Sequence, residues 1–383
     1  MPSVFIKTFG CQANKSDSER ILGDYLARGY VETAKWREAD EIVLNTCSVR
    51  QSAEDRVRGF LLNLSKYVTE SGENKPKVIL TGCMLHFKEK ELKELLPEVD
   101  EILPLSEVGF NQKAIRKDKT SAWVPISTGC NSFCTYCIVP FSRGREKSRP
   151  MPEIINEVKK LAEEGYTTIN LLGQNVNSYG LEKTGITLRK LYLNKDNFNA
   201  ASIPDNSTQY EKPKDTPPFV ILLREISKIK GIEKITFFTS NPWDFWDELI
   251  DEIANNPKID RFIHLPVQSG SNRILKLMNR GYTREAYLTL IEKIKAKVPD
   301  VVFGTDIIVG FPGEADQDFQ DTVDLVKKVG FKIAFVARYS PRPGTASYKL
   351  YSDDVPAKIK KERWEILDQI ANKDNLDNRP LVP

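Results

Sequence analysis

The chain has 383 residues, which is long enough for two or three domains. Of these residues 40% are hydrophobic and 28% are charged, a composition typical of a folded globular protein. Lysine and arginine number 56 against 53 acidic residues, so the formal net charge is only +3; charge alone neither demands nor excludes a nucleic-acid partner. No apolar run reaches the length of a signal peptide core or a membrane span. We therefore expect a cytoplasmic protein without membrane contact, whose six cysteines stay reduced and bind metal.

Residues 1–112 are predicted to form an N-terminal α/β domain. Short apolar runs begin at Val4, Ile42 and Val78, and a helical pattern follows each. Apolar strands that alternate with helices indicate a parallel sheet covered on both faces. Ser16 and Glu19 have the spacing of a capping box, which predicts that the first helix starts at Ser16.

One cysteine ends each of these three strands: Cys11, Cys47 and Cys83 follow at equal intervals of about one βα unit. The carboxyl ends of parallel strands meet at the edge where open α/β sheets bind ligands. Three thiolates could therefore converge on a metal centre that has no fourth protein ligand. The alternative is that they are three buried structural cysteines, since free cysteine is often buried.

The second domain is predicted over 123–345, after a charged linker at 113–122. Six apolar strands alternate with helical patterns there, which favours a partial (β/α)6 barrel because eight strands would need a longer chain. A polar stretch at about 181–218 is expected to be a surface insertion. Residues 346–383 are predicted to form a charged helix and a polar tail.

A second set of cysteines, Cys130, Cys134 and Cys137, lies after the first strand of this barrel. Their spacing can place three thiolates around one soft metal centre. The only histidines are His86 and His264, so no nearby histidine completes a tetrahedral zinc site. A cluster held by three thiolates leaves one iron open. A zinc knuckle completed by a distant ligand remains the alternative.

Seven stretches carry a family resemblance: Gly10–Arg20, Leu44–Arg50, Thr81–Cys83, Gly129–Pro140, Leu172–Tyr179, His264–Gly270 and Ile308–Glu314. Together they resemble the radical S-adenosylmethionine (SAM) methylthiotransferases, and within them the MiaB-type tRNA methylthiotransferases. The resemblance runs from Val4 to about Thr345. It implies a methylthiotransferase domain followed by a radical SAM barrel. Relatives usually carry an RNA-binding TRAM domain after the barrel, and we expect none within 346–383.

The resemblance implies an enzyme with two [4Fe-4S] clusters and SAM as cofactors. The cluster on Cys130, Cys134 and Cys137 would cleave SAM to a 5′-deoxyadenosyl radical, which would take hydrogen from C2 of N6-isopentenyladenosine beside the tRNA anticodon. The auxiliary cluster on the N-terminal cysteines would deliver sulfur, methylated by a second SAM. No side-chain acid or base is assigned. The implied partners are the anticodon stem-loop and an electron donor such as flavodoxin or ferredoxin, and we expect a monomer.

Two further groups of residues are candidates for ligand contact. The resemblance places Tyr136 beside the adenine of SAM, and polar residues at strand ends could reach other parts of SAM: Gly173, Gln174, Asn175, Ser240, Gln268 and Ser269. Structural capping is the alternative for these. A basic run after the cysteines suits an RNA backbone, although such a run can also be a solvated face: Arg143, Arg145, Lys147 and Arg149.

Three alternatives stay open. Within the family, the substrate could be threonylcarbamoyladenosine in tRNA or an aspartate of a ribosomal protein. Outside it, the chain could be a metal-stabilised RNA-binding or electron-transfer protein without catalytic activity.

Overall fold

The computed structural model describes residues 1–48, 51–87, 89–104, 107, 113–181 and 215–373. Most of the predicted insertion at about 181–218 and the end of the predicted C-terminal tail lie outside these residues. The chain divides into two compact units. The first contains Met1–Lys119 and Ile138–Gly144, and the second contains Thr120–Cys137 and the described part of Arg145–Pro380. No helix among the described residues is both long and apolar enough to cross a membrane.

The first unit is built on a parallel sheet with the strand order β2-β1-β3-β4-β5. The strands are β1 Ser3–Thr8, β2 Val31–Glu32, β3 Glu41–Thr46, β4 Lys77–Gly82 and β5 Glu101–Ile102. Its helical segments are α1 Gln12–Ala27, η1 Trp36–Glu38, α2 Gln51–Ser71, η2 Cys83–His86, α3 Glu89–Leu95 and α4 Val139–Ser142. The predicted α/β sheet is thus confirmed, with two short strands that the sequence patterns did not show.

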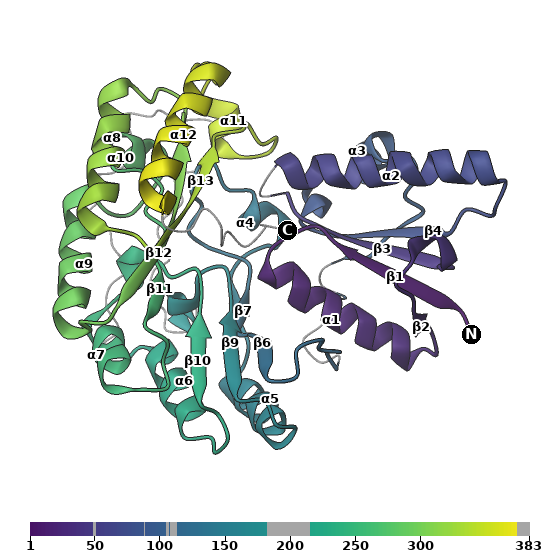
Figure 1. The fold of residues 1–383 in the computed structure, drawn as a ribbon, viewed down its shortest axis with the longest axis horizontal. Coiled ribbons are helices and arrows are strands. Elements are labelled where there is room, and N and C mark those ends of the chain that lie inside the picture. The colour runs from purple at the N-terminus through teal and green to yellow at the C-terminus, as the bar shows by residue number, and fades with distance from the viewer. Residues whose placement is uncertain (49–50, 88, 105–106, 108–112, 182–214, 374–383) are drawn as a thin grey trace. The chain divides into compact units, whose positions relative to one another are not determined.

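Helices cover both faces of this sheet (Figure 1). Ile42 and Leu44 of β3 pack with Leu61 of α2 on one face. Val43, between them, packs with Ile21 of α1 on the other face. Successive side chains of a strand point to opposite faces, so a continuous apolar run indicates a strand buried on both sides.

The predicted start of the first helix at Ser16 is wrong. Helix α1 begins at Gln12, and Cys11 is its N-cap residue. Ser16 is buried within the helix, and its hydroxyl accepts a hydrogen bond from Arg20 Nη1 at 2.5 Å. The serine therefore binds a side chain one turn later instead of capping backbone N–H groups. As a result Cys11 lies at the junction between β1 and α1.

The described part of the second unit contains six parallel strands that follow the chain order: β6 Ser121–Pro125, β9 Thr168–Leu172, β10 Lys234–Phe237, β11 Phe262–His264, β12 Val302–Val309 and β13 Ile333–Arg338. They form two three-stranded parallel sheets, with β9 central in one and β12 central in the other. A parallel bridge between Ile235 and Ile259 leads from β10 towards β11. This arrangement confirms the predicted partial barrel.

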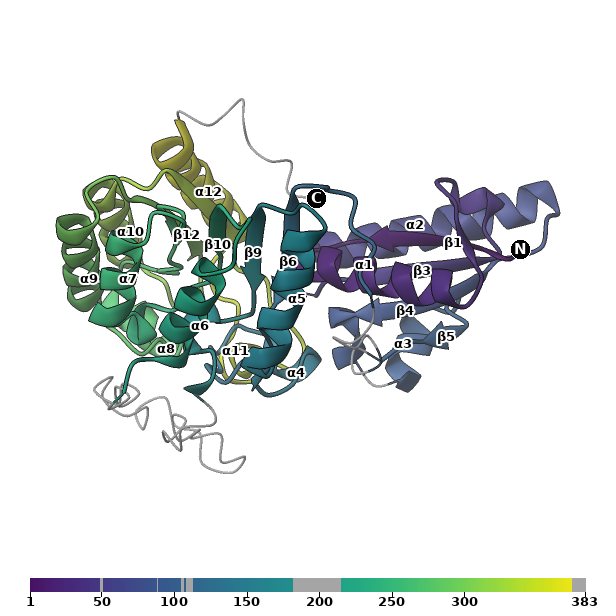
Figure 2. The same ribbon diagram turned by 90° about the horizontal axis from the view of Figure 1, so that it is seen from below.

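Helices lie on the outside of these strands, as Figures 1 and 2 show. The helices are α5 Met151–Glu163, α6 Pro218–Ser227, α7 Asp247–Asn255, α8 Asn272–Leu277, α9 Arg284–Lys297, α10 Asp316–Val329, α11 Ala346–Leu350 and α12 Ala357–Asn372. Shorter segments at strand ends are η3 Val176–Ser178, η6 Pro242–Asp244 and the antiparallel pair β7 Ser127–Thr128 with β8 Lys147–Ser148. The inward faces of strands and helices share one large apolar core.

The last described helix, α12, is part of this core. Trp364 Nε1 donates to the Val336 carbonyl of β13 at 2.9 Å, and Leu367 is fully buried. Asn372 makes hydrogen bonds with both backbone groups of Ala334. The charged pattern at the C-terminal end of the sequence is thus the outer face of a barrel helix.

Candidate active site

In the first unit, three cysteines stand at the carboxyl ends of neighbouring strands. Thr46 pairs with Gly82 across β3 and β4, so Cys47 and Cys83, the next residues, are neighbours in the sheet. Cys11 follows β1, the other neighbour of β3. Cys47 and Cys83 are buried, whereas Cys11 is exposed.

Two asparagines and a glycine fix this edge. Asn14 Nδ2 donates to Asn45 Oδ1 at 2.8 Å, and Asn45 Nδ2 donates back to the Asn14 carbonyl at 2.7 Å. These bonds join the first turn of α1, where Cys11 is the N-cap, to the end of β3. Gly82 has φ 94°, and a Cβ there would lie 2.3 Å from the Thr46 carbonyl oxygen. Glycine is therefore required before Cys83.

Arg143 belongs to this first unit, and its surroundings differ from those expected of an RNA contact. Its Nε donates to Cys83 Sγ at 3.4 Å, and its Nη2 lies 2.8 Å from Asp17 Oδ2 on α1. The side chain is only 7% exposed. A buried guanidinium that is held by a carboxylate and a cysteine has little access to a phosphate backbone.

In the second unit, Cys130, Cys134 and Cys137 lie on a tight loop after β7. Gly129, with φ 72°, turns the chain into this loop. The Cys130 sulfur accepts a hydrogen bond from the Ser132 backbone N–H at 3.4 Å. The Cys137 N–H donates to the Cys134 carbonyl at 3.0 Å, which closes a turn between the two.

Burial raises the pKa of the Cys130 thiol to about 12, with a further contribution from the Glu146 carboxylate. Without a metal this cysteine therefore keeps its proton. A metal centre would displace the proton, because metal binding and deprotonation of a thiol are linked.

The end of α8 holds this loop in place. Thr135 Oγ1 donates to the Leu277 carbonyl at 2.9 Å, and Asn279 Nδ2 donates to the Phe133 carbonyl at 3.0 Å. Both Phe133 and Asn279 have positive φ, at 46° and 57°. Such backbone conformations cost energy in residues other than glycine and tend to occur at functional sites. Next to Asn279, Arg280 Nη1 donates to Cys134 Sγ at 3.2 Å.

The donor chemistry of both sets of cysteines, three thiols in each, suits an iron–sulfur cluster. Among the residues that the structure describes, no three His, Cys, Asp or Glu side chains are arranged to hold one metal ion. In a four-iron cluster each thiolate binds a different iron, so the three sulfurs need to surround a larger volume. Three thiols per set, supported by N–H donors and buried arginines, fit a negatively charged iron–sulfur group.

Beside the second set, buried polar atoms without partners lie at the strand ends. Among the described residues they include the hydroxyls of Ser127 and Ser240 and the side-chain oxygens of Asn175 and Asn241. Asn241 Nδ2 also reaches Ser132 Oγ in the cysteine loop at 3.4 Å. Unpaired buried polar atoms are costly, so this cluster indicates a polar ligand. Two of the predicted SAM contacts, Asn175 and Ser240, belong to this group of unpaired polar residues.

Gly173 lies next to Ser127, one of these unpaired polar residues, because a Cβ at position 173 would come within 2.5 Å of Ser127 Oγ. The next residue, Gln174, is half-buried.

The remaining predicted SAM contacts, Gln268, Ser269 and Tyr136, have hydrogen-bond or packing partners within the protein. Gln268, with φ 71°, exchanges backbone hydrogen bonds with β12. Ser269 Oγ accepts from the Ser271 N–H at 3.2 Å, which supports the structural capping alternative for Ser269. Tyr136 packs against a small apolar cluster that contains Met278 and Phe311.

Asp244 is a buried carboxylate that sequence reasoning missed. It follows β10, is 1% exposed and accepts a hydrogen bond from Asn175 Nδ2 at 3.3 Å. Burial raises its pKa to about 7. A single acidic residue between Trp243 and Phe245, just after a strand, was the signal in the sequence, since a carboxylate among aromatic residues needs a specific partner. Arg280 was also missed, in a short polar turn after α8.

The remaining basic residues divide into two kinds. Arg145 and Lys147 are exposed, and the Arg145 guanidinium lies 4.6 Å from the centre of the Phe133 ring. Arg149 is buried, with an ion pair to Glu157 at 2.8 Å and a hydrogen bond to the Pro125 carbonyl at 2.7 Å. These contacts hold the Arg149 guanidinium inside the barrel.

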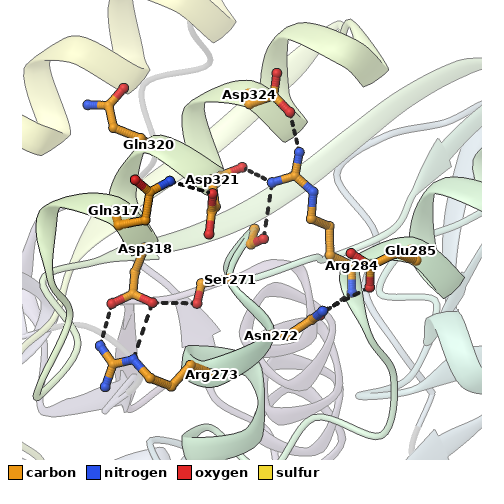
Figure 3. A pocket seen from close by; sticks show the side chains of 11 residues that line it. Ser271, Asn272, Arg273, Arg284, Glu285, Gln317, Asp318, Gln320, Asp321 and Asp324 are labelled. Atoms are coloured by element: carbon orange, nitrogen blue, oxygen red, sulfur yellow. Dashed lines mark hydrogen bonds and ion pairs between the residues drawn. The ribbon is translucent and has the colours of Figure 1, made fainter.

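An open groove beside α8, α9 and α10 is polar as well (Figure 3). Arg284 forms an ion pair with Asp324, and Arg273 forms one with Asp318. Ser271 Oγ donates to Asp318 Oδ1 at 2.6 Å. Carboxylates therefore neutralise both arginines, and this network anchors the segment that carries Gln268 without forming an anion site.

Comparison with known proteins assigns both units to families. Residues 124–326 match the radical SAM superfamily, and residues 3–104 match a family described as uncharacterized protein family UPF0004. A Thermotoga petrophila protein named tRNA-2-methylthio-N(6)-dimethylallyladenosine synthase is 42% identical over 399 residues, which cover 97% of this chain and 82% of the relative. An Aquifex aeolicus protein of the same name is 39% identical over 408 residues, covering 96% and 85%.

Solved structures agree at the level of the fold. The radical SAM methyltransferase TsrM from Kitasatospora setae has a TM-score of 0.59 at 12% identity, covering 91% of this chain and 77% of that chain. The radical SAM enzyme OxsB has a TM-score of 0.53 at 11% identity, covering 98% and 56%.

Proposed function

Because the chain belongs to the MiaB-type tRNA methylthiotransferase family of the radical SAM superfamily, we propose that it methylthiolates C2 of N6-isopentenyladenosine beside the anticodon of tRNA. One observation carries the proposal: each compact unit presents three cysteines at the carboxyl ends of parallel strands or in the loop that follows them. Each set lacks a fourth protein thiolate, as expected for a cluster with one open iron. Zinc or purely structural cysteines would not require two such incomplete sets.

The two sets have different tasks. Cys130, Cys134 and Cys137 would hold the cluster to which SAM binds. The three cysteines of the first unit would hold the auxiliary cluster: Cys11, Cys47 and Cys83. When bound, the first cluster supplies the electron for SAM cleavage and the second supplies the sulfur. Burial of Cys47 and Cys83 in one set and of Cys130 and Cys134 in the other limits water at the reacting groups, which protects radical chemistry.

The chain's own residues bind and orient SAM. The unpaired oxygens of Asn175, Ser240 and Asn241 suit the amino and hydroxyl groups of SAM, which donate hydrogen bonds. Gly173 leaves space beside Ser127 that a larger residue would fill. Arg145 and Lys147, both exposed, are the residues of the basic run that can contact the RNA backbone. We further propose a cytoplasmic monomer that receives electrons from a flavodoxin or ferredoxin.

A single anaerobic experiment tests the chemistry with matched variants. The reconstituted chain is expected to hold about eight irons, to release 5′-deoxyadenosine on reduction with SAM, and to convert an isopentenylated anticodon stem-loop to the methylthio product. Cys47→Ala should keep about four irons and SAM cleavage but form no methylthio product. Cys134→Ala should also keep about four irons but cleave no SAM.

Substrate choice is tested in the same assay. A threonylcarbamoylated stem-loop and a ribosomal peptide with the target aspartate are offered in parallel with the isopentenylated stem-loop. Modification of either one in place of the isopentenylated RNA would contradict the substrate assignment. Two zinc ions per chain with no SAM cleavage would contradict the enzyme assignment itself and favour a metal-stabilised binding protein.

A further inference from the structure

Within the first unit, Arg143 connects the elements that carry two of the proposed cluster ligands. Its Nε donates to the sulfur of Cys83, the first residue of η2. Its Nη2 pairs with Asp17 on α1, the helix that Cys11 caps. Helix α4, which ends just before Arg143, packs against η2 in the same unit. Arg143 thus links η2, which begins at Cys83, to α1, which Cys11 caps.

The contact has an electrostatic consequence for an iron–sulfur group. Reduction of a cluster adds negative charge to it, and net charge and hydrogen bonds to the sulfurs are the main protein influences on its potential. A guanidinium is always protonated, and here its side chain is 7% exposed, so water screens its charge only weakly. An N–H donor and a positive charge at Cys83 both stabilise the reduced form more than the oxidised form.

Asp17 acts in the opposite direction. Its carboxylate, 16% exposed, lies 2.8 Å from Arg143 Nη2 and offsets part of the positive charge near the cysteines. The ion pair also restricts the guanidinium to one orientation, which points Nε towards Cys83. The pair therefore combines a positioning effect with a partly balanced charge.

We propose that Arg143 is a positioning residue for the auxiliary cluster: it orients Cys83 and raises the reduction potential of the group bound there, while Asp17 limits that rise. This inference rests on the proposed auxiliary cluster. It assigns Arg143 to sulfur delivery, in place of the RNA contact expected from its position in a basic run.

The test isolates the auxiliary cluster in the full-length chain by changing Cys130, Cys134 and Cys137 together to alanine. Midpoint potentials are then measured by redox titration followed by electron paramagnetic resonance, alongside iron content. Arg143→Gln should lower the reduced-to-oxidised ratio at a given potential about tenfold, which is about 59 mV for one electron. The midpoint potential of Arg143→Lys should lie between those of the parent chain and Arg143→Gln. Asp17→Asn should shift the potential upwards.

Each outcome supports or overturns a defined statement. Arg37→Gln, an exposed arginine of the same unit, is the control and should leave the potential unchanged. If the triple cysteine variant binds no iron, the auxiliary cluster itself is refuted. If iron is bound but Arg143→Gln leaves the potential unchanged and weakens tRNA binding instead, Arg143 is an RNA contact. If Arg143→Gln binds no iron, Asp17→Asn becomes the test, because it keeps the arginine. An upward shift of its midpoint potential supports the proposal, and an unchanged potential overturns it.

Discussion

The Arg280 guanidinium lies against the sulfur of Cys134, with Nη1 donating at 3.2 Å. Its Nη2 donates to the Pro266 carbonyl at 2.9 Å, and its Nε donates to the Tyr282 hydroxyl at 3.0 Å. The Trp243 ring centre lies 4.8 Å from the guanidinium carbon. None of these described partners is a carboxylate. A buried cation is stable only when a negative group compensates it, and the proposed cluster on these thiolates would supply that charge.

We therefore predict that Arg280→Gln slows reductive SAM cleavage about tenfold to a hundredfold, since a hydrogen bond to a charged group contributes roughly 1.5–3 kcal/mol. The measurement is 5′-deoxyadenosine release with dithionite as reductant, in a chain whose Cys11, Cys47 and Cys83 are changed to alanine. Arg224→Gln is the matched control, because Arg224 forms a half-exposed ion pair with Glu252 elsewhere in the barrel. Equal rates in Arg280→Gln and the control would show that the contact is only structural.

Asp244 predicts a pH dependence of stability. Its pKa in the folded chain is about 7 because of burial, whereas an unfolded aspartate ionises near pH 4. Between about pH 4 and 7 the folded chain holds a proton that the unfolded chain has lost. The contribution of Asp244 to stability is therefore fully present below the lower pKa and is lost as pH rises to the higher one.

Asp244→Asn removes this titration. Both chains are measured without metal. The thermal midpoint of the variant minus that of the parent chain should increase as pH rises from 5 to 7, and this difference should become constant above pH 7. The upper bound is about 4 kcal/mol, from about 1.36 kcal/mol per pKa unit. Asp251→Asn in α7, where the carboxylate is half-exposed and paired with Lys297, controls for the change of charge. A difference that does not vary with pH would contradict the raised pKa.

How far the sequence predicted the site depends on the kind of signal. Cys47 and Cys83 could be placed at neighbouring strand ends because periodic apolar runs define strands, and parallel strands end at the same edge. Arg143 and Arg149 could not be placed, because a basic run of alternating residues has no periodicity that reveals which side chains are buried. Their partners, Asp17 and Glu157, lie on other elements and are known only from the folded chain.

The start of α1 was mispredicted for a related reason. Ser16 and Glu19 have the correct spacing for a capping box, but the helix starts four residues earlier, at Gln12. Tertiary hydrogen bonds between Asn14 and Asn45 stabilise the earlier turn. Local capping preferences contribute about 1 kcal/mol, so two buried side-chain hydrogen bonds outweigh them.

Gly173 and Ser127 form a pair that a double-mutant cycle can test. A Cβ at position 173 would lie 2.5 Å from Ser127 Oγ and 3.3 Å from Val176 Cγ1. We predict that Gly173→Ala weakens SAM binding and destabilises the chain by about 1–3 kcal/mol through overpacking. Adding Ser127→Ala should recover most of the stability, because it removes the clashing oxygen.

The control for this cycle is Gly59→Ala in α2, where an added Cβ meets no atom within 4 Å. That variant should be more stable by about 0.5–1 kcal/mol, because alanine favours a helix interior. SAM binding is measured by equilibrium dialysis of the reconstituted protein. If Ser127→Ala fails to rescue Gly173→Ala, the glycine is needed for its backbone or for the ligand, and the steric explanation is wrong.

Arg145 and Lys147 predict the salt dependence of tRNA binding. Phosphate contacts release bound counterions, so each lost contact reduces the slope of log affinity against log salt by about 0.7–0.9. Changing both residues to glutamine should therefore reduce the slope by about 1.4–1.8 and weaken binding at low salt, without altering SAM cleavage in the absence of RNA. Lys230→Gln with Lys234→Gln is the matched control, because these lysines lie at the amino end of β10, away from the strand ends that carry the site. Equal loss in both double variants would indicate a nonspecific charge effect, and no change in the slope would exclude Arg145 and Lys147 as phosphate contacts.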